Sequence, residues 1–123
     1  MNVRNLIWGL EELSDKALQE KLWTGTVEGE MSSFVEAICS VFDDSGLSRV
    51  LDSSDPMDEI SPEIRERAIR LGRLIKQVPQ SATPLEIIQC SVMDEVRTLA
   101  GELLTLVRKN IPAEQSEFRR YDT

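Results

Sequence analysis

Six acidic residues crowd one short part of the chain, between residues 40 and 62 (SVFDDSGLSRVLDSSDPMDEISP), with a single arginine among them. They are Asp43, Asp44, Asp52, Asp55, Asp58 and Glu59. Carboxylates at this density suit three kinds of chemistry: they ligate a metal ion, they transfer protons in catalysis, or they attract a basic partner. Each use requires a different arrangement, so the spacing of the acids helps to decide between them.

A calcium-binding EF-hand loop fits this stretch poorly. Such a loop has oxygen ligands at positions 1, 3 and 5, glycine at position 6 and glutamate at position 12. With Gly46 at position 6, Asp43 and Asp52 fall at positions 3 and 12, but position 1 is Val41, which has no ligand atom. The aspartate at the last position is also shorter than the usual glutamate. We therefore predict no metal site in this stretch.

Catalysis is disfavoured by the residue types that the chain lacks. It contains no histidine, which is the commonest general base and metal ligand. Its two cysteines, Cys39 and Cys90, are too few for a zinc site, follow isoleucine-containing stretches and are typical of small core residues. Two pairs of helical carboxylates remain: Glu63 with Glu66 is crowded by arginines, and the adjacent residues 94–95 do not share a helix face. The sequence predicts a protein that is not an enzyme and binds no cofactor.

The negative charge of the chain is confined to its first half. Residues 1–60 hold 13 acids and 4 bases, a balance of −9, whereas residues 61–123 hold 9 acids and 10 bases, a balance of +1, which together give −8. Aspartate is common in turns, where it bonds its own backbone, and this explains each acid singly but the density less well. A surface of this sign repels nucleic-acid phosphates and attracts a basic protein.

A basic stripe follows the acids along the chain. Arg67, Arg70, Arg73 and Lys76 step by three within the region expected to form a helix over residues 62–78. Such a stripe suits a solvated helix face, pairing with the acidic half of the chain, or the binding of an anion. The sequence leaves open whether the stripe belongs to the same interface as the acids.

Helices must position all these charges, because apolar residues recur with a period of 3.6 and no clear alternating run appears. We predict an all-α fold, a compact domain of five to six helices in a bundle-like or orthogonal arrangement. The expected helical ranges are 3–10, 14–22, 33–42, a short turn at 47–51, 62–78 and 84–107, the last either continuous or reopening at Ser91. The expected start and stop signals are Ser14, Gly25, Ser33 with Glu36, Ser61 with Pro62, and Thr83 with Glu86.

The expected domain covers residues 1–112, and residues 113–123, which show no apolar pattern, are expected to form a frayed tail. The apolar patch near the N-terminus is short for a secretory segment, and no run of apolar residues approaches the length of a membrane span. Two cysteines do not make a disulfide framework. We therefore expect a reduced, cytoplasmic protein with no membrane contact.

The block LSDKALQEKLWTG, followed by SSFVEAICSVFDDSGLSRVLD, resembles in its arrangement the small acidic, all-helical immunity proteins that accompany polymorphic or contact-dependent toxins in bacteria. The shared features are a leucine–tryptophan–glycine turn, a helix capped by two serines and an Asp-Asp-Ser-Gly break, within residues 13–78. The resemblance implies a cytoplasmic protein without enzymatic activity that binds one cognate toxin and blocks it. No active-site residue is implied.

The leading hypothesis is therefore an immunity protein that neutralises a basic protein toxin, such as a nuclease, as a monomer or weak dimer. Its predicted partner-binding residues are Asp43, Asp44, Asp52, Asp55, Asp58, Glu59 and, as an apolar anchor, Trp23. The alternative hypothesis is an acidic secretion chaperone or adaptor that holds a segment of a partner. The alternative predicts a dimer and a large exposed apolar groove.

Overall fold

The computed structural model of the protein describes residues 2–25, 32–53, 60–79 and 81–110. Within these ranges the regular structure is helical throughout, which confirms the predicted all-α fold. The elements are α1 (Val3–Ser14), α2 (Lys16–Trp23), α3 (Phe34–Cys39), the π-helical turn η1 (Ser40–Asp44), α4 (Leu47–Asp52), α5 (Pro62–Ile75), α6 (Pro84–Gln89) and α7 (Ser91–Lys109). The expected tail, residues 113–123, lies outside the described residues.

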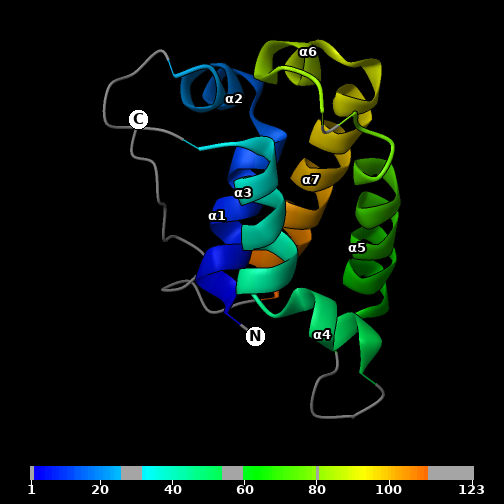
Figure 1. Ribbon diagram of the computed structural model, residues 1–123. Coiled ribbons are helices and arrows are strands. Elements are labelled where there is room, and N and C mark those ends of the chain that lie inside the picture. The colour runs from blue at the N-terminus through cyan, green and yellow to red at the C-terminus, as the bar shows by residue number, and fades with distance from the viewer. Residues whose placement is uncertain (1, 26–31, 54–59, 80, 111–123) are drawn as a thin grey trace.

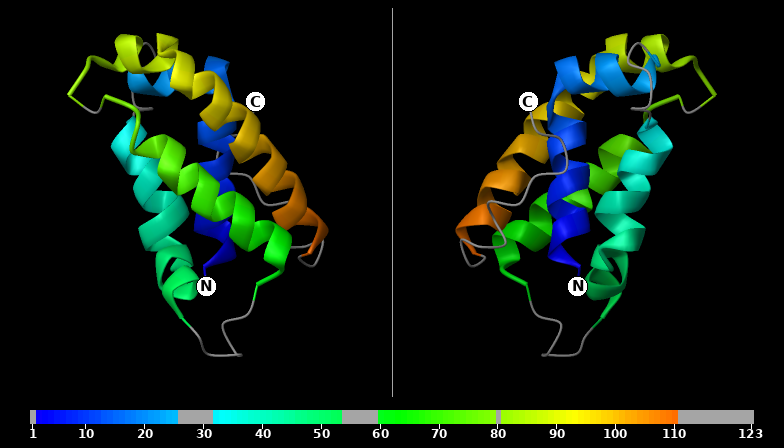
Figure 2. Two further views of the ribbon diagram at one scale, coloured as in Figure 1. Left: turned by 90° about the vertical axis from the view of Figure 1, so that its right-hand side faces the viewer. Right: turned by 90° about the vertical axis from the view of Figure 1, so that its left-hand side faces the viewer.

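The body of the molecule consists of α1, the continuous segment α3–η1, α5 and α7 (Figure 1). α1 packs between α3–η1 and α7, and α5 packs against the other side of α7. α2 and α6 cross one end of these helices and contact each other, while α4 continues from η1 at the opposite end (Figure 2). The acidic end of η1 and the start of α5 therefore lie at the end of the molecule away from α2 and α6.

Local capping sets most helix starts where the sequence places them. The hydroxyl of Ser61 accepts a hydrogen bond from Ile64 N at 3.2 Å, and Pro62 occupies the first turn of α5. Thr83 and Glu86 form a complete capping box at α6, with the two reciprocal bonds at 3.1 and 3.2 Å. These bonds satisfy backbone donors that the first turn of a helix leaves without partners.

One helix start differs from the expectation, and a second had been left open by the sequence. Asp15, and not Ser14, caps α2 through a 3.1 Å bond from Leu18 N, while the Ser14 hydroxyl donates to the carbonyl of Glu11. The chain also bends at Cys90, whose extended ψ of 136° separates α6 from α7. The described ranges therefore contain seven α-helices, and Ser91 opens α7, which is one of the two alternatives that the sequence left open.

The predicted apolar stripes of α5 and α7 supply much of the core. The stripe of α5 is buried at every expected position, namely Ile64, Ala68, Leu71, Ile75 and the following Val78. α7 is buried on a wide face because it lies between α1 and α5, and its buried residues are Met93, Val96, Leu99, Ala100, Leu103, Leu104 and Val107. Burial of apolar surface on this scale is the main force that stabilises the fold.

A polar network is buried among these helices where α1, α2 and α7 meet. The Glu12 carboxylate, 2% exposed, accepts hydrogen bonds from Trp23 Nε1 at 2.9 Å and from Ser32 Oγ at 2.8 Å. Gln19, fully buried, donates to the carbonyl of Glu12 and accepts from Arg97 Nη1 at 2.8 Å. Buried polar groups are tolerated only when they are bonded in this way, so the network fixes how α2 sits on α1.

Candidate partner-binding site

The exposed ends of η1 and α4 carry three of the six predicted acids. Asp43 and Asp44 are the last two residues of η1, and Asp52 is the last residue of α4; all three side chains are exposed. The other three members of the predicted acidic patch lie outside the residues that the structure describes: Asp55, Asp58 and Glu59. Asp43, Asp44 and Asp52 therefore form the part of the patch whose geometry is defined.

A tight corner after η1 holds the two acids of η1. The buried Ser45 donates its hydroxyl to the carbonyl of Val41 and accepts a hydrogen bond from Leu47 N at 3.0 Å. Its carbonyl accepts a 2.6 Å bond from the backbone N–H of Asn2, which ties the start of α1 to this corner. Gly46 has a φ of +83°, a conformation that glycine adopts without strain, and α4 begins directly after it. The corner presents its acids on a hydrogen-bonded support.

Asp43 and Asp44 line a shallow hollow of about 460 Å³ together with Phe42, Ser48 and Arg49. The lining is mainly polar and includes two carboxylates and one cation, Arg49. No ion pair involving Asp43 or Asp44 occurs within the described ranges. Charges that are not neutralised within the molecule remain available to attract a cation on a partner. Turns of the π type are also frequent at functional sites.

The negative potential of this corner affects a neighbouring thiol. Burial raises the pKa of Cys39, and the charges of Asp43, Asp44 and Glu36 raise it further because a thiolate is repelled by carboxylates. Cys39 and Cys90 are both free and half-buried. A thiol with a raised pKa is a poor nucleophile at neutral pH, so Cys39 does not have the environment of a catalytic cysteine.

Asp52 belongs to a different hollow, although it lies at the same end of the molecule. The guanidinium of Arg65 on α5 donates to the carbonyl of Leu51 at 3.0 Å and to that of Val50 at 3.4 Å. A cation bonded to the last carbonyls of a helix also interacts favourably with the helix dipole. Arg65 thus fixes the end of α4, and with it Asp52, against the start of α5.

Trp23 is placed in the core, so it does not supply the exposed anchor expected from the sequence. Its side chain is 5% exposed, its Nε1 donates to Glu12, and its ring packs edge-on against Phe34 with the ring centroids 5.8 Å apart. The indole N–H finds its acceptor on a helix eleven residues earlier in the chain. A buried partner at that distance gives no signal in the local sequence pattern.

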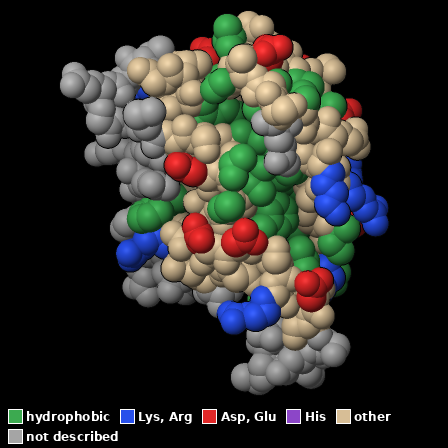
Figure 3. Space-filling model, viewed as in Figure 1, with side chains coloured by type: hydrophobic (Ala, Val, Ile, Leu, Met, Phe, Trp, Pro, Cys, Tyr) green, Lys and Arg blue, Asp and Glu red, His purple; other side chains and the backbone are tan. Residues whose placement is uncertain are grey.

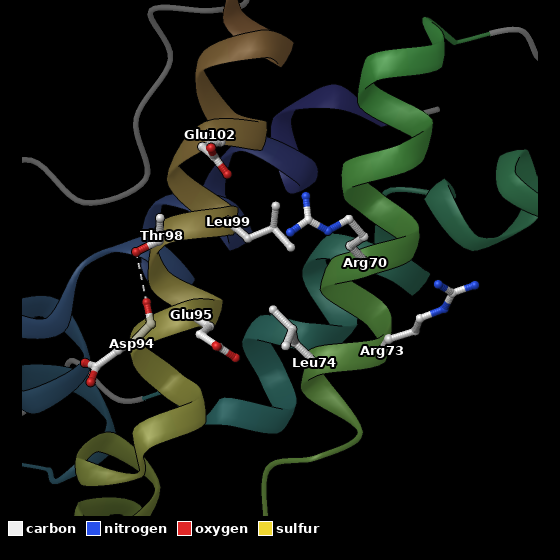
Figure 4. A pocket seen from close by; sticks show the side chains of 8 residues that line it. All are labelled: Arg70, Arg73, Leu74, Asp94, Glu95, Thr98, Leu99 and Glu102. Atoms are coloured by element: carbon white, nitrogen blue, oxygen red, sulfur yellow. Dashed lines mark hydrogen bonds between the residues drawn. The ribbon is translucent and has the colours of Figure 1, made fainter.

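Two residues of the basic stripe, Arg70 and Arg73, line a hollow of about 540 Å³ between α5 and α7. Figure 4 shows Arg70 reaching from α5 toward α7, Arg73 pointing away from α7, and Asp94 turned to the far side of α7. Asp94 pairs with Arg97 at 2.9 Å, and no ion pair within the described part of the chain joins the two arginines to the acids of α7. These charged groups do not converge on one point, so the hollow lacks the geometry of a catalytic centre.

A second groove, of about 410 Å³, lies between α3–η1–α4 and α5. Its lining is mainly apolar and includes Ile38, Phe42, Ile69 and Gly72, with Arg73 and other polar groups at the edges. Figure 3 shows hydrophobic side chains in a band down the middle of this face, with acidic groups at its lower left and basic groups at its right. This groove was not predicted from the sequence. The available signal was Ile69, an apolar residue that lies off the buried stripe of α5.

Among the residues that the structure describes, no three histidine, cysteine, aspartate or glutamate side chains gather in a way that would hold a metal ion. None of the helices in the described ranges combines the length and the apolar composition needed to cross a membrane. Comparison of the chain with family models, with curated proteins and with solved structures finds no match.

Proposed function

We propose that the protein is an inhibitor-type binding protein of the immunity class, which binds a basic protein toxin and blocks it through the carboxylates near η1 and α4. The observation that carries this proposal is the pair of exposed carboxylates Asp43 and Asp44, displayed on a braced corner without an ion pair in the described ranges. The acidic first half of the chain adds a long-range attraction for a cationic partner.

This mechanism requires no bond to be made or broken. Carboxylates opposite a cationic cleft imitate the phosphates of a nucleic-acid substrate, steer the two proteins together and fix their register. The proposed location is the cytoplasm, where the two free thiols, Cys39 and Cys90, stay reduced. Asp55, Asp58 and Glu59, the other predicted members of the patch, lie outside the described residues.

The test begins with co-purification of the protein with the product of the adjacent gene. Asp43→Lys and Asp44→Lys are then introduced together, and association is measured at several salt concentrations. The matched control is Glu20→Lys with Glu95→Lys, which changes the net charge equally at two exposed positions on α2 and α7. We expect the first pair to slow association about tenfold or more and to reduce its salt dependence. Equal effects of the two pairs would rule out Asp43 and Asp44 as the binding surface.

A second candidate function is an adaptor that holds a segment of a partner protein, and the apolar groove between α3–η1–α4 and α5 favours it. Exposed apolar grooves are typical of proteins that accept an amphipathic segment. The chaperone or adaptor hypothesis drawn from the sequence predicts that the protein is a dimer. Sedimentation of the purified protein therefore discriminates, because a monomer at micromolar concentration counts against a dimeric chaperone.

A further inference from the structure

The groove between α3–η1–α4 and α5 is a surface that the acidic-patch proposal does not use. Its floor and walls come from Ile38, Phe42, Leu51, Ala68, Ile69 and Gly72. Ile69 is 38% exposed although it lies on a helix whose buried stripe is elsewhere. An exposed apolar side chain that lies beside other apolar side chains is more typical of a binding surface than of a solvated helix face.

The groove exists because its two walls pack on different neighbours. α5 buries its apolar stripe against α7, while η1 packs on α1. Figure 1 shows α3 and α5 on opposite sides of this face. Neither wall has a helical partner within the described ranges that covers Ile69 or the half-buried Ile38 and Phe42.

A smaller hollow extends the apolar surface along α3. It has a volume of about 160 Å³ and is lined by Trp23, Phe34, Val35, Pro84 and Ile87, among others. Val35 is 51% exposed and lies one helical turn before Ile38, so the two hollows follow successive turns of the same helix. The two hollows share no lining residue, but a bound helix that lay along α3 would contact Val35 in one and Ile38 in the other.

The edge of the groove on α5 is basic. Arg73 and Lys76 line it, both are exposed, and neither forms an ion pair within the described part of the chain. Figure 4 shows Arg73 pointing away from α7, and the same side chain contributes to the lining of both the α5–α7 hollow and this groove. The opposite edge carries Asp52. An occupant is therefore favoured if its carboxylates face α5.

We infer that this groove binds an amphipathic helix of a partner protein, with the apolar face of that helix against Ile38, Phe42 and Ile69 and its carboxylates beside Arg73 and Lys76. This inference deepens the second candidate function by naming the chemistry of the bound segment, and it does not depend on Asp43 or Asp44. The positions of the charges specify which flank of the bound helix faces α5.

Gly72 provides a specific way to block the groove without disturbing the fold. A Cβ atom at this position would have Phe42 Cζ and Cε1 as its nearest neighbours, at 3.9 and 4.0 Å, which is ordinary van der Waals contact. Glycine is also the least favourable ordinary residue inside a helix other than proline. Gly72→Leu should therefore fill the groove while the protein remains folded, and Gly72→Ala is the matched control.

The probe is a fluorescent synthetic helix of about 14 residues, roughly 21 Å long, with leucines at positions i, i+3, i+4 and i+7 and glutamates on one flank. A second peptide carries lysines in place of the glutamates. Affinities are measured by fluorescence anisotropy, with thermal melting of each variant as the check on folding. We expect the glutamate peptide to bind about tenfold more tightly than the lysine peptide, and salt to reduce the difference.

The variants separate the two parts of the inference. Gly72→Leu should lower the affinity for the glutamate peptide about tenfold without lowering the melting temperature, whereas Gly72→Ala should change the affinity less than about twofold. Arg73→Glu with Lys76→Glu should reverse the preference between the two peptides. A preference of the native protein for the lysine peptide would overturn the assigned charge arrangement while leaving the adaptor function in place.

Two other outcomes would overturn the inference as a whole. Failure of both peptides to bind would remove the groove as a helix-binding site and the adaptor function with it. Sedimentation that shows a dimer, converted to a monomer by Gly72→Leu and not by Gly72→Ala, would assign the groove to a second copy of this chain. Neither outcome would affect the carboxylate surface of the immunity proposal, which is tested with different variants.

Discussion

Replacing Gly9 with alanine should destabilise the protein, although the same change stabilises most helices. Gly9 lies within α1 at its contact with α3–η1. A Cβ atom there would lie 2.5 Å from Val41 Cγ2, 3.0 Å from Val41 N and 3.1 Å from the carbonyl oxygen of Ala37. Two of these three atoms belong to the backbone, so the overlap cannot be relieved by rotation of a side chain alone.

The expected magnitude follows from two opposing effects. Alanine in place of glycine stabilises a helix interior by about 1 kcal/mol. Insertion of a carbon into a close-packed contact costs about 1–3 kcal/mol, and the backbone atoms at Gly9 place the cost near the upper value. The net loss in the free energy of unfolding should be about 2 kcal/mol, which corresponds to a decrease in Tm of about 6–10 °C for a chain of this size.

Urea denaturation followed by far-UV circular dichroism measures this loss, and Gly101→Ala is the internal control. Gly101 lies in α7, and a Cβ atom there would have Ser14 Cβ as its nearest neighbour, at 3.9 Å. Gly101→Ala should therefore stabilise the protein by up to about 1 kcal/mol. Addition of Val41→Ala to the Gly9 variant removes the nearest contact, so the two changes should be less than additive. A Gly9 variant as stable as the Gly101 variant would refute the close approach of α1 and η1.

Three further predictions concern single polar groups. Glu12→Ala should lower the free energy of unfolding, measured by urea denaturation, by about 2–4 kcal/mol, because it leaves the buried Trp23 N–H without its acceptor. The same change at an exposed glutamate of α2 should cost much less. In a variant that lacks the other cysteine, alkylation of Cys39 should begin at a higher pH than alkylation of a cysteine peptide, because burial and Asp43 raise the pKa of Cys39. Asp43→Asn should lower the pH at which alkylation begins, and identical pH profiles for protein and peptide would contradict the assignment. The hydrogen bonds with Thr83 lower the pKa of Glu86 below its ordinary value of 4.5, so the stabilisation by its carboxylate is present above pH 4.5 and is lost as pH falls through the lowered pKa. The difference in Tm between the native protein and Glu86→Gln should therefore shrink in acid, and a constant difference would count against the capping box.

Local sequence patterns predicted those parts of the fold that local physics determines. Ser61 with Pro62 and Thr83 with Glu86 act within one helical turn, so the residues alone specify the helix start. The buried stripes of α5 and α7 were likewise evident from spacing. The choice of Asp15 over Ser14 as the cap of α2 was not evident, because adjacent residues of similar capping preference give the same signal.

The features that the sequence did not predict depend on contacts between distant segments. Glu12 appears in the sequence as one of many surface-type acids, and only the approach of Trp23 and Ser32 explains its burial. The apolar groove depends on how far α3 and α5 stand apart, which neither helix encodes alone. The separation of Asp52 from the hollow at Asp43 and Asp44 depends in the same way on how Arg65 fixes α4 against α5.

The π-helical turn also determines the rotational phase of everything that follows it. A turn of this type contains about one residue more than an α-helical turn, and one residue corresponds to about 100° of rotation about the helix axis. Deletion of a single residue within Ser40–Asp44 would therefore restore a regular helix and swing α4 around that axis. The carbonyls bonded by Arg65 would then turn away from α5, so one surplus residue keeps α4 in register with the start of α5.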